Sequence, residues 1–177
     1  MTALARPDVR LHASWAAAIL DFDGDTVHGA GLWHLEDEDY VLDEAGCALV
    51  VERLADYTNP TAVLPDGIVA SDYFWVTEGE PAEVIGFLAV RHELTAWLLV
   101  EGGHIGYSIR PSRRREGHAT RALALAVRRA VELGIERALV TCDDDNLASA
   151  RTIELNGGVH EDTRNGKRRY WIDTSGR

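Results

Sequence analysis

The chain has 177 residues, of which 46% are hydrophobic and 27% are charged, with a formal net charge of -11 at pH 7. This composition suits one domain over residues 1–177, because domains commonly run to ~100–200 residues. The acidic excess repels nucleic-acid backbones over most of the surface, and no segment approaches the ~18 apolar residues of a membrane span. Two cysteines are too few for a disulfide framework. We therefore expect a cytoplasmic protein without nucleic-acid or membrane partners.

The N-terminal part of the chain carries two patterns of helical spacing. Leu11, Trp15, Ile19 and Phe22 recur every three or four residues, and a second apolar set runs over residues 42–57. These patterns predict two helices at the start of the fold.

Three strands are predicted next. Residues 72–77 and 82–92 are rich in β-branched and aromatic side chains and flank the turn segment "EGEP", so they predict a hairpin. Large apolar residues occupy every second position towards the end of residues 102–110, and Pro111 follows. This pattern predicts a third strand that ends before the proline.

The remaining half of the chain reads as helix, strand, helix and hairpin. Apolar residues at helical spacing follow Ala119 as far as a glycine at 134, and residues 136–143 form a short apolar strand. Residues 146–158 predict a helix that begins at an asparagine and ends at a glycine pair. The dipeptide Asn165–Gly166 predicts the turn of a terminal hairpin. This order of elements predicts an α/β fold.

An arginine-rich turn, "RPSRRREG", joins the strand over residues 102–110 to the helix that follows. A helix N-terminus exposes unpaired N–H groups and the positive end of the helix dipole, so it forms an anion site. Gly117 lets a ligand approach the backbone, and Arg113, Arg114 and Arg115 would add a positive rim. We expect a phosphate group here, with a merely solvated surface as the alternative. Walker A and G-x-G-x-x-G motifs are both absent from the sequence.

The segment "R-R-E-G-H-A" over residues 114–119 resembles the Q/R-x-x-G-x-G/A loop of the GNAT superfamily of N-acetyltransferases. The segment "N-L-A-S" over residues 146–149 is similar to the N-x-x-S element of that family, and the elements between them follow in the same order. The resemblance implies a mixed, mostly antiparallel central sheet flanked by helices, with a splay between the family's strands 4 and 5. It covers the C-terminal half well and puts the cofactor-binding part at about residues 103–158.

By this resemblance, acetyl-CoA would be the co-substrate and would lie between the splayed strands. Its pyrophosphate would bind N–H groups of the loop, and the N–H near Ile109 would polarise the thioester carbonyl. Asn146 would bind the pantetheine arm, although a helix N-cap explains this residue equally well. The implied cofactor-binding residues are Ile109, Arg114, Arg115, Glu116, Gly117, His118, Ala119, Thr120 and Asn146.

Acetyl transfer to an amine needs a base, because an ammonium group has no lone pair. His104 and Glu101 are the candidates at the start of the strand over residues 102–110. Of the two, His104 is preferred, since imidazole titrates near neutrality.

The departing thiolate needs a proton, and the family usually supplies it from a tyrosine seven residues after its asparagine. That position is Ile153 in this sequence, and its side chain can donate nothing. The remaining proton donors are Ser149, Tyr107, Tyr170 and water.

The resemblance therefore implies an enzyme that moves the acetyl group of acetyl-CoA directly to a primary amine of a small molecule or a peptide. Acidic segments over residues 21–25 and 34–40 would suit a cationic acceptor. A non-catalytic acetyl-CoA-binding or sensing module is the alternative, and a homodimer is compatible with either. We expect no metal, because "TCDDDN" over residues 141–146 reads as an acidic helix entry and the histidines are scattered.

Overall fold

The computed structural model describes residues 1–32, 41–59, 61 and 63–176. Its elements in chain order are β1 (Ala3–Ala5), a 3-10 turn (Val9–Leu11), α1 (His12–Leu20), α2 (Glu44–Thr58), β2 (Ser71–Glu78), β3 (Glu83–Arg91), β4 (Ile105–Ile109), a 3-10 turn (Pro111–Arg113), α3 (His118–Glu132), β5 (Arg137–Asp143), α4 (Leu147–Leu155), β6 (Gly158–Arg164) and β7 (Lys167–Asp173). No helix in this part of the chain is long and apolar enough to cross a membrane.

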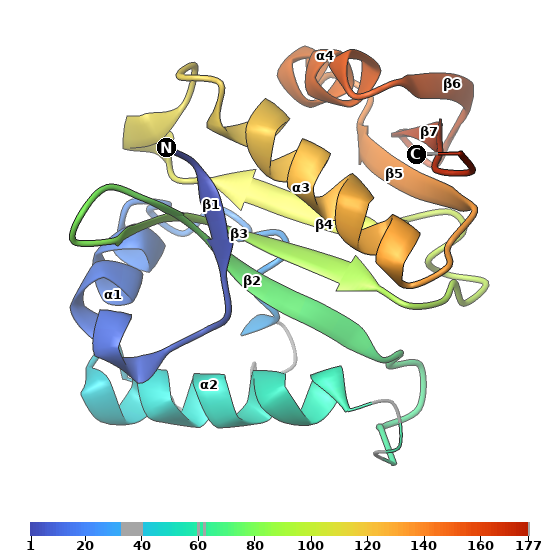
Figure 1. Cartoon of the computed structure of the whole chain (residues 1–177). Coiled ribbons are helices and arrows are strands. Elements are labelled where there is room, and N and C mark those ends of the chain that lie inside the picture. Colours follow the sequence, from blue (N-terminus) through green and yellow to red (C-terminus); the bar gives the residue numbers. More distant parts are fainter. Residues whose placement is uncertain (33–40, 60, 62, 177) are drawn as a thin grey trace.

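The strands of the described chain form a seven-stranded sheet in the order β1-β2-β3-β4-β5-β7-β6. All neighbours are antiparallel except β4 and β5, which run parallel and pair only at Ile105 and Val140. The predicted mixed sheet with a splay between these two strands is therefore confirmed. Figure 1 shows the chain passing from the N-terminal strand at one edge of the sheet to the β6–β7 hairpin at the other.

Two apolar layers hold the helices against opposite faces of the sheet. One layer joins α3 and α4 to strands β2–β5 and β7, and the other joins α1 and α2 to β2 and β3. The largest fully buried side chains include Trp15, Trp75, Tyr170, Phe22 and Phe87. At ~25 cal/mol per Å² of apolar surface, burial of this kind is the main source of stability.

Two predicted local signals are found as expected. In the β6–β7 hairpin, Asn165 and Gly166 both have positive φ angles of 49° and 74°, as a two-residue turn that matches strand twist requires. Helix α3 buries a stripe of small and apolar residues and ends before Gly134, whose φ is 73°.

Strand β1 was not predicted from the sequence. It pairs with β2 from Ala3 opposite Thr77 to Ala5 opposite Trp75, at the edge of the sheet. Three residues are too few to show a period of two, so only the partner strand defines this element.

A buried carboxylate ties the N-terminal segment to the sheet and to α3. The side chain of Asp72 is 1% exposed, and its oxygens lie 2.8 Å from Arg6 Nη2 and 2.7 Å from Arg129 Nε. Burial alone would raise the pKa of Asp72, but the hydrogen bonds and charges of Arg129 and Arg6 outweigh it and lower the pKa.

We predict that Asp72→Asn lowers the free energy of unfolding at pH 7 by about 2 kcal/mol, because it removes the buried carboxylate charge that is hydrogen-bonded to Arg129 and ion-paired with Arg6. Because the folded pKa is depressed, the contribution is present above the unfolded pKa near 3.8 and is lost as the pH falls through the folded value. Urea unfolding at pH 7 measures the difference. Glu132→Gln is the matched control: it removes an exposed partner of Arg129 and should change stability by less than about 1 kcal/mol.

Candidate functional site

The gap between β4 and β5, called the V below, begins just beyond the pair of Ile105 and Val140. The bond from Arg110 N to Ile85 O (3.0 Å) shows that the even-numbered residues of β4 pair with β3. Strand alternation then turns the N–H and C=O groups of Tyr107 and Ile109 into the V, where no strand of the described chain pairs with them. This backbone can therefore pair with an extended amide-bearing ligand.

The arginine-rich turn leads from the open end of β4 into α3. Arg115 and Gly117 both have left-handed backbone conformations, with φ angles of 66° and 79°. Gly117 is the N-cap of α3 and supplies no side chain to cap the N–H groups of the first turn. These N–H groups and the helix dipole lie where the sequence predicts an anion site, and anion binding there stays a prediction. The positive φ of Gly117 is a backbone conformation that favours glycine, whereas the nearest atom to a Cβ there, Arg121 Nη1 at 2.8 Å, is the end of a flexible side chain.

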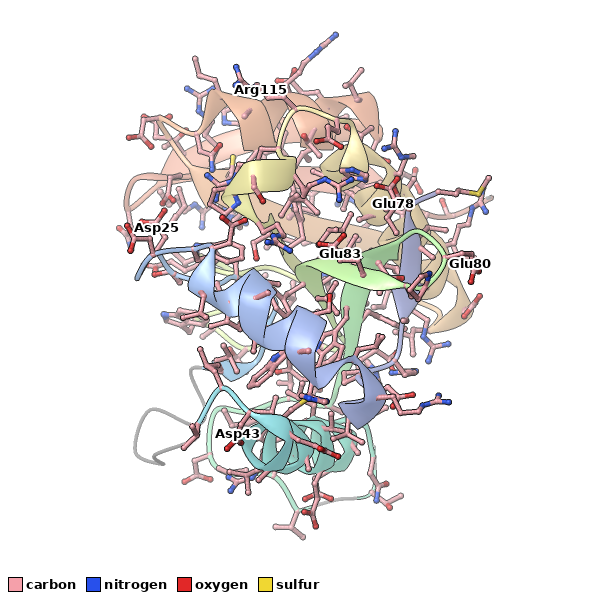
Figure 2. The ribbon with its side chains drawn as sticks, turned by 90° about the vertical axis from the view of Figure 1, so that its left-hand side faces the viewer. Asp25, Asp43, Glu78, Glu80, Glu83 and Arg115 are labelled. Carbon is pink, nitrogen blue, oxygen red and sulfur yellow. The ribbon has the colours of Figure 1, made fainter. Side chains whose placement is uncertain are left out.

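The three arginines of the turn do not form the expected rim. Arg113 is ion-paired with Glu78 and Glu116, so its charge is neutralised within the protein. Arg114 turns back to donate from Nε to Ile109 O at 3.0 Å. Only the exposed Arg115 has a side chain without a partner in the described chain, and Figure 2 labels it on the turn before α3. The prediction of three anion-binding arginine side chains is therefore wrong for Arg113.

Other side chains of the loop anchor it to the N-terminus of the chain. The buried ring of His118 lies with Nδ1 2.9 Å from Thr2 Oγ1 and Nε2 3.1 Å from the Glu116 carboxylate. Arg121 donates to Thr2 Oγ1 at 2.8 Å and to Glu116 O at 2.8 Å. Since the side chains of His118 and Glu116 are used in this way, only their backbone N–H groups can serve the anion site. Ala119 and Thr120 complete the first turn of α3.

A metal ion would have to compete with an arginine at this anchor. One ligand atom from each of Glu78, Glu116 and His118 lies within 4.8 Å of the others, a spacing that could hold an ion. The guanidinium of Arg113 is already bonded to both carboxylates. The cluster is therefore arranged as an ion-pair network.

His104 fastens β4 to β5 at the closed end of the V. Its N–H donates to Leu139 O at 2.7 Å, and its ring Nδ1 accepts from Leu139 N at 2.9 Å. Burial, and then the charge of Arg91, lower the pKa of His104 to about 4. The neutral ring carries its proton on Nε2, so neither nitrogen has a lone pair free for an amine. Glu101 lies nearby in the turn before β4, half-buried. The catalytic roles of His104 and Glu101 stay predictions.

We predict that His104→Phe lowers the free energy of unfolding by about 2 kcal/mol at pH 7, because Leu139 N–H loses its acceptor. His104→Asn should retain most of the stability, since its side-chain oxygen can replace Nδ1. A folded pKa below the unfolded 6.5 means that the His104 contribution is full above pH 6.5 and is lost as the pH falls towards 4. Urea unfolding at pH 7 and pH 5 tests both statements; equal pH dependence in wild type and His104→Phe would contradict them.

On the other arm of the V, α4 begins with a side-chain cap. Asn146 Oδ1 accepts from Ser149 N at 3.0 Å, which confirms the N-cap interpretation, while the contact with pantetheine stays a prediction. The Ser149 hydroxyl lies 2.9 Å from the Tyr107 hydroxyl and so bridges α4 and β4. Burial raises the pKa of Tyr107 to about 12, which keeps the phenol protonated at neutral pH.

The residue at the position of the family's usual tyrosine lies in the hydrophobic core. Ile153 is fully buried, and Tyr170 is only 1% exposed. Of the predicted donors, Ser149 and Tyr107 are the two side chains that meet at the V.

The face of β4 opposite Ser149 is covered by the connection after α1. Hydrogen bonds from Ser112 and Arg110 lower the pKa of Asp21 to about 2, so this carboxylate has a structural partner, whereas Asp23 and Asp25 are exposed. The second acidic segment, residues 34–40, lies outside the described residues. The same connection places the backbone of His28 against β4. No motif in the sequence points to His28.

Comparison with known families agrees with this geometry. A model described as "Acetyltransferase (GNAT) domain" matches residues 50–159, which is more than half of the chain. The protein therefore belongs to the GNAT acetyltransferase family. No curated protein matched the sequence.

Solved structures share the fold at low sequence identity. The microcin C7 self-immunity acetyltransferase MccE, in complex with acetyl-CoA and AMP, is 14% identical with a TM-score of 0.64, over 97% of this chain and 92% of its own. The ribosomal-protein-S5-alanine acetyltransferase of Vibrio fischeri is 15% identical with a TM-score of 0.65, over 99% and 93%. Mycobacterium smegmatis RimJ, in complex with a CoA disulfide, is 18% identical with a TM-score of 0.65, over 97% and 81%. These likenesses concern the fold.

Proposed function

We propose that the protein transfers the acetyl group of acetyl-CoA directly to a primary amine of a small molecule or a peptide. Two neighbouring features carry the proposal: the α3 N-terminus at Gly117 has no side-chain cap, and the Tyr107 backbone and the Ile109 N–H face the V without a partner strand in the described chain. Coenzyme A has an anionic pyrophosphate, which would bind the helix N-terminus, and an extended chain with two amides, which would pair with the strand backbone. Family members solved with acetyl-CoA or a CoA disulfide support this reading.

The pyrophosphate would bind the N–H groups of residues 115–120. The helix dipole contributes ~0.3–1 kcal/mol of attraction, and the charge of Arg115 adds to it. Because Arg113 is neutralised by carboxylates, backbone donors carry most of the binding. Because backbone N–H groups point in fixed directions, they favour a pyrophosphate whose oxygens match those directions over anions of other shapes.

The thioester would lie along β4, where its carbonyl oxygen can accept from Ile109 N–H. Such a donor stabilises the negative charge that develops on the oxygen as the amine attacks, and can contribute ~3 kcal/mol to the rate. The amine then bonds to the carbonyl carbon, and the C–S bond breaks with its electron pair on sulfur.

Ser149 is the residue that we assign to protonate the sulfur. Ser149 lies in the first turn of α4, and a 2.9 Å hydrogen bond joins its hydroxyl to that of Tyr107, whose strand borders the V. This pair replaces the family's usual tyrosine, whose position Ile153 keeps within the core. A non-catalytic acetyl-CoA sensor remains the second candidate, because this replacement leaves only a weakly acidic hydroxyl pair.

We predict that Gly117→Glu weakens acetyl-CoA binding at least about 100-fold in calorimetric titration, because a carboxylate would lie against the pyrophosphate. Gly134→Glu is the matched control, since Gly134 also has a positive φ (73°) and lies at the other end of the same helix. The control should bind acetyl-CoA as the wild type does. Equal affinity in the wild type and Gly117→Glu would refute the proposed cofactor site.

We predict that Ser149→Ala lowers kcat about 100-fold with little change in acetyl-CoA affinity, as expected for loss of a proton donor. Tyr107→Phe should lower kcat about tenfold, since it removes one orienting hydrogen bond. Free-thiol release over a panel of amines measures the rates. Acetyl-CoA binding without turnover of any amine by the wild type would favour the sensor instead.

A further inference from the structure

The connection between α1 and α2 brings a histidine onto the face of β4 opposite Ser149. We propose that His28 is the general base that takes the proton from the acceptor amine. The assignment rests on the proposed acetyl transfer, and it names the residue that makes the acceptor reactive.

The backbone at His28 is held directly on β4. Ser108 Oγ donates to His28 O at 2.7 Å, and Ser108 lies between the two residues whose backbone faces the V. At the next residue, a Cβ on Gly29 would lie 2.5 Å from Gly106 O and 2.9 Å from Leu88 Cα. Only a glycine, here with a φ of 83°, allows this close approach. The position of His28 along β4 is therefore fixed.

Charged groups from three strands influence the His28 ring. The charged groups that act on it are Asp143 at the end of β5, Lys167 at the start of β7 and Arg91 at the end of β3. The His28 carbonyl is bonded to Ser108, the residue before Ile109, so the backbone of His28 is held beside the N–H that we assign to the thioester carbonyl. The residue is exposed, so an acceptor can reach it.

The surroundings favour a neutral ring. Partial burial of the ring, followed by the positive charge of Lys167, lowers the pKa of His28; Asp143 opposes the shift and Arg91 adds to it. A neutral imidazole at pH 7 has the lone pair that a base requires. By contrast, the ring of His104 holds Leu139 N–H and has no nitrogen to offer.

In this proposal, deprotonation of the amine and protonation of the sulfur take place on opposite faces of β4. The His28 ring removes one proton from the ammonium group and passes it to water, so the amine gains its lone pair. The amine attacks the thioester carbon from this face, and the C–S electron pair goes to sulfur. Water accepts the second proton from the nitrogen as the amide forms. The thiolate receives a proton from the Ser149 hydroxyl on the opposite face, and Ser149 then takes a proton back from water. The sum is acetyl-CoA and ammonium giving amide, free CoA and one proton.

The test compares the wild type with His28→Gln and His28→Ala, using acetyl-CoA with ethanolamine and an alanyl peptide as protonated amines and hydroxylamine as an amine that is unprotonated at pH 7.5. For the protonated amines we expect kcat/KM to fall about 100-fold and its acid limb to disappear. For hydroxylamine the fall should be less than about threefold. Added imidazole should restore His28→Ala, which a purely structural role would not allow.

Two controls locate the effect. His160→Gln removes an exposed histidine on β6 and should leave all rates unchanged. Glu101→Gln tests the competing base; loss of the acid limb in this variant, with an unaltered profile in His28→Gln, overturns the assignment.

Calorimetry separates the two proposals. His28→Gln should bind acetyl-CoA as the wild type does. Wild-type protein that does not bind acetyl-CoA, or binds it without turnover, would overturn the proposed function and the base with it. Wild-type turnover that survives in His28→Gln with the same pH profile would overturn the base alone.

Discussion

The whole site depends on one short contact between two parallel strands. His104 and Leu139 exchange hydrogen bonds through a backbone N–H and through the imidazole ring, immediately before the single pair of Ile105 and Val140. Beyond this point the strands separate, so the backbone of Tyr107 faces a gap. Unpaired buried backbone groups cost about 1–3 kcal/mol each, so the sheet can keep such a gap only where a ligand or water completes the pairing.

Although the protein is acidic overall, positive charge gathers in one turn, where partners within the protein bind most of it. The arginine-rich turn stands out against a net charge of -11, yet Glu78 and Glu116 neutralise Arg113, and Arg114 is used to bond Ile109 O. The side chains shape the loop, and in the proposed function the N–H groups at the α3 N-terminus are the anion-binding donors. Backbone donors at fixed angles select a phosphate by geometry, which mobile side chains at the surface do less well.

The two faces of β4 differ in chemistry because strand residues alternate in direction. Tyr107 points towards α4 and meets Ser149, whereas Gly106 and Ser108 point towards the connection that carries His28. In the proposed reaction the base acts on the amine and the acid acts on the sulfur, so the two groups must lie at different places around the thioester. One strand can therefore position both.

The sequence by itself determined the features that depend on neighbouring residues: the Asn165–Gly166 hairpin, the glycine at the start of α3 and the Asn146 cap, because turn and cap geometry is set within a few residues. With the family resemblance it also predicted the splayed sheet. Only the tertiary structure decided which side chains meet. Tyr107 and Ser149 are 42 residues apart and His104 and Leu139 are 35 apart, and no local pattern encodes contacts made by packing separate elements together.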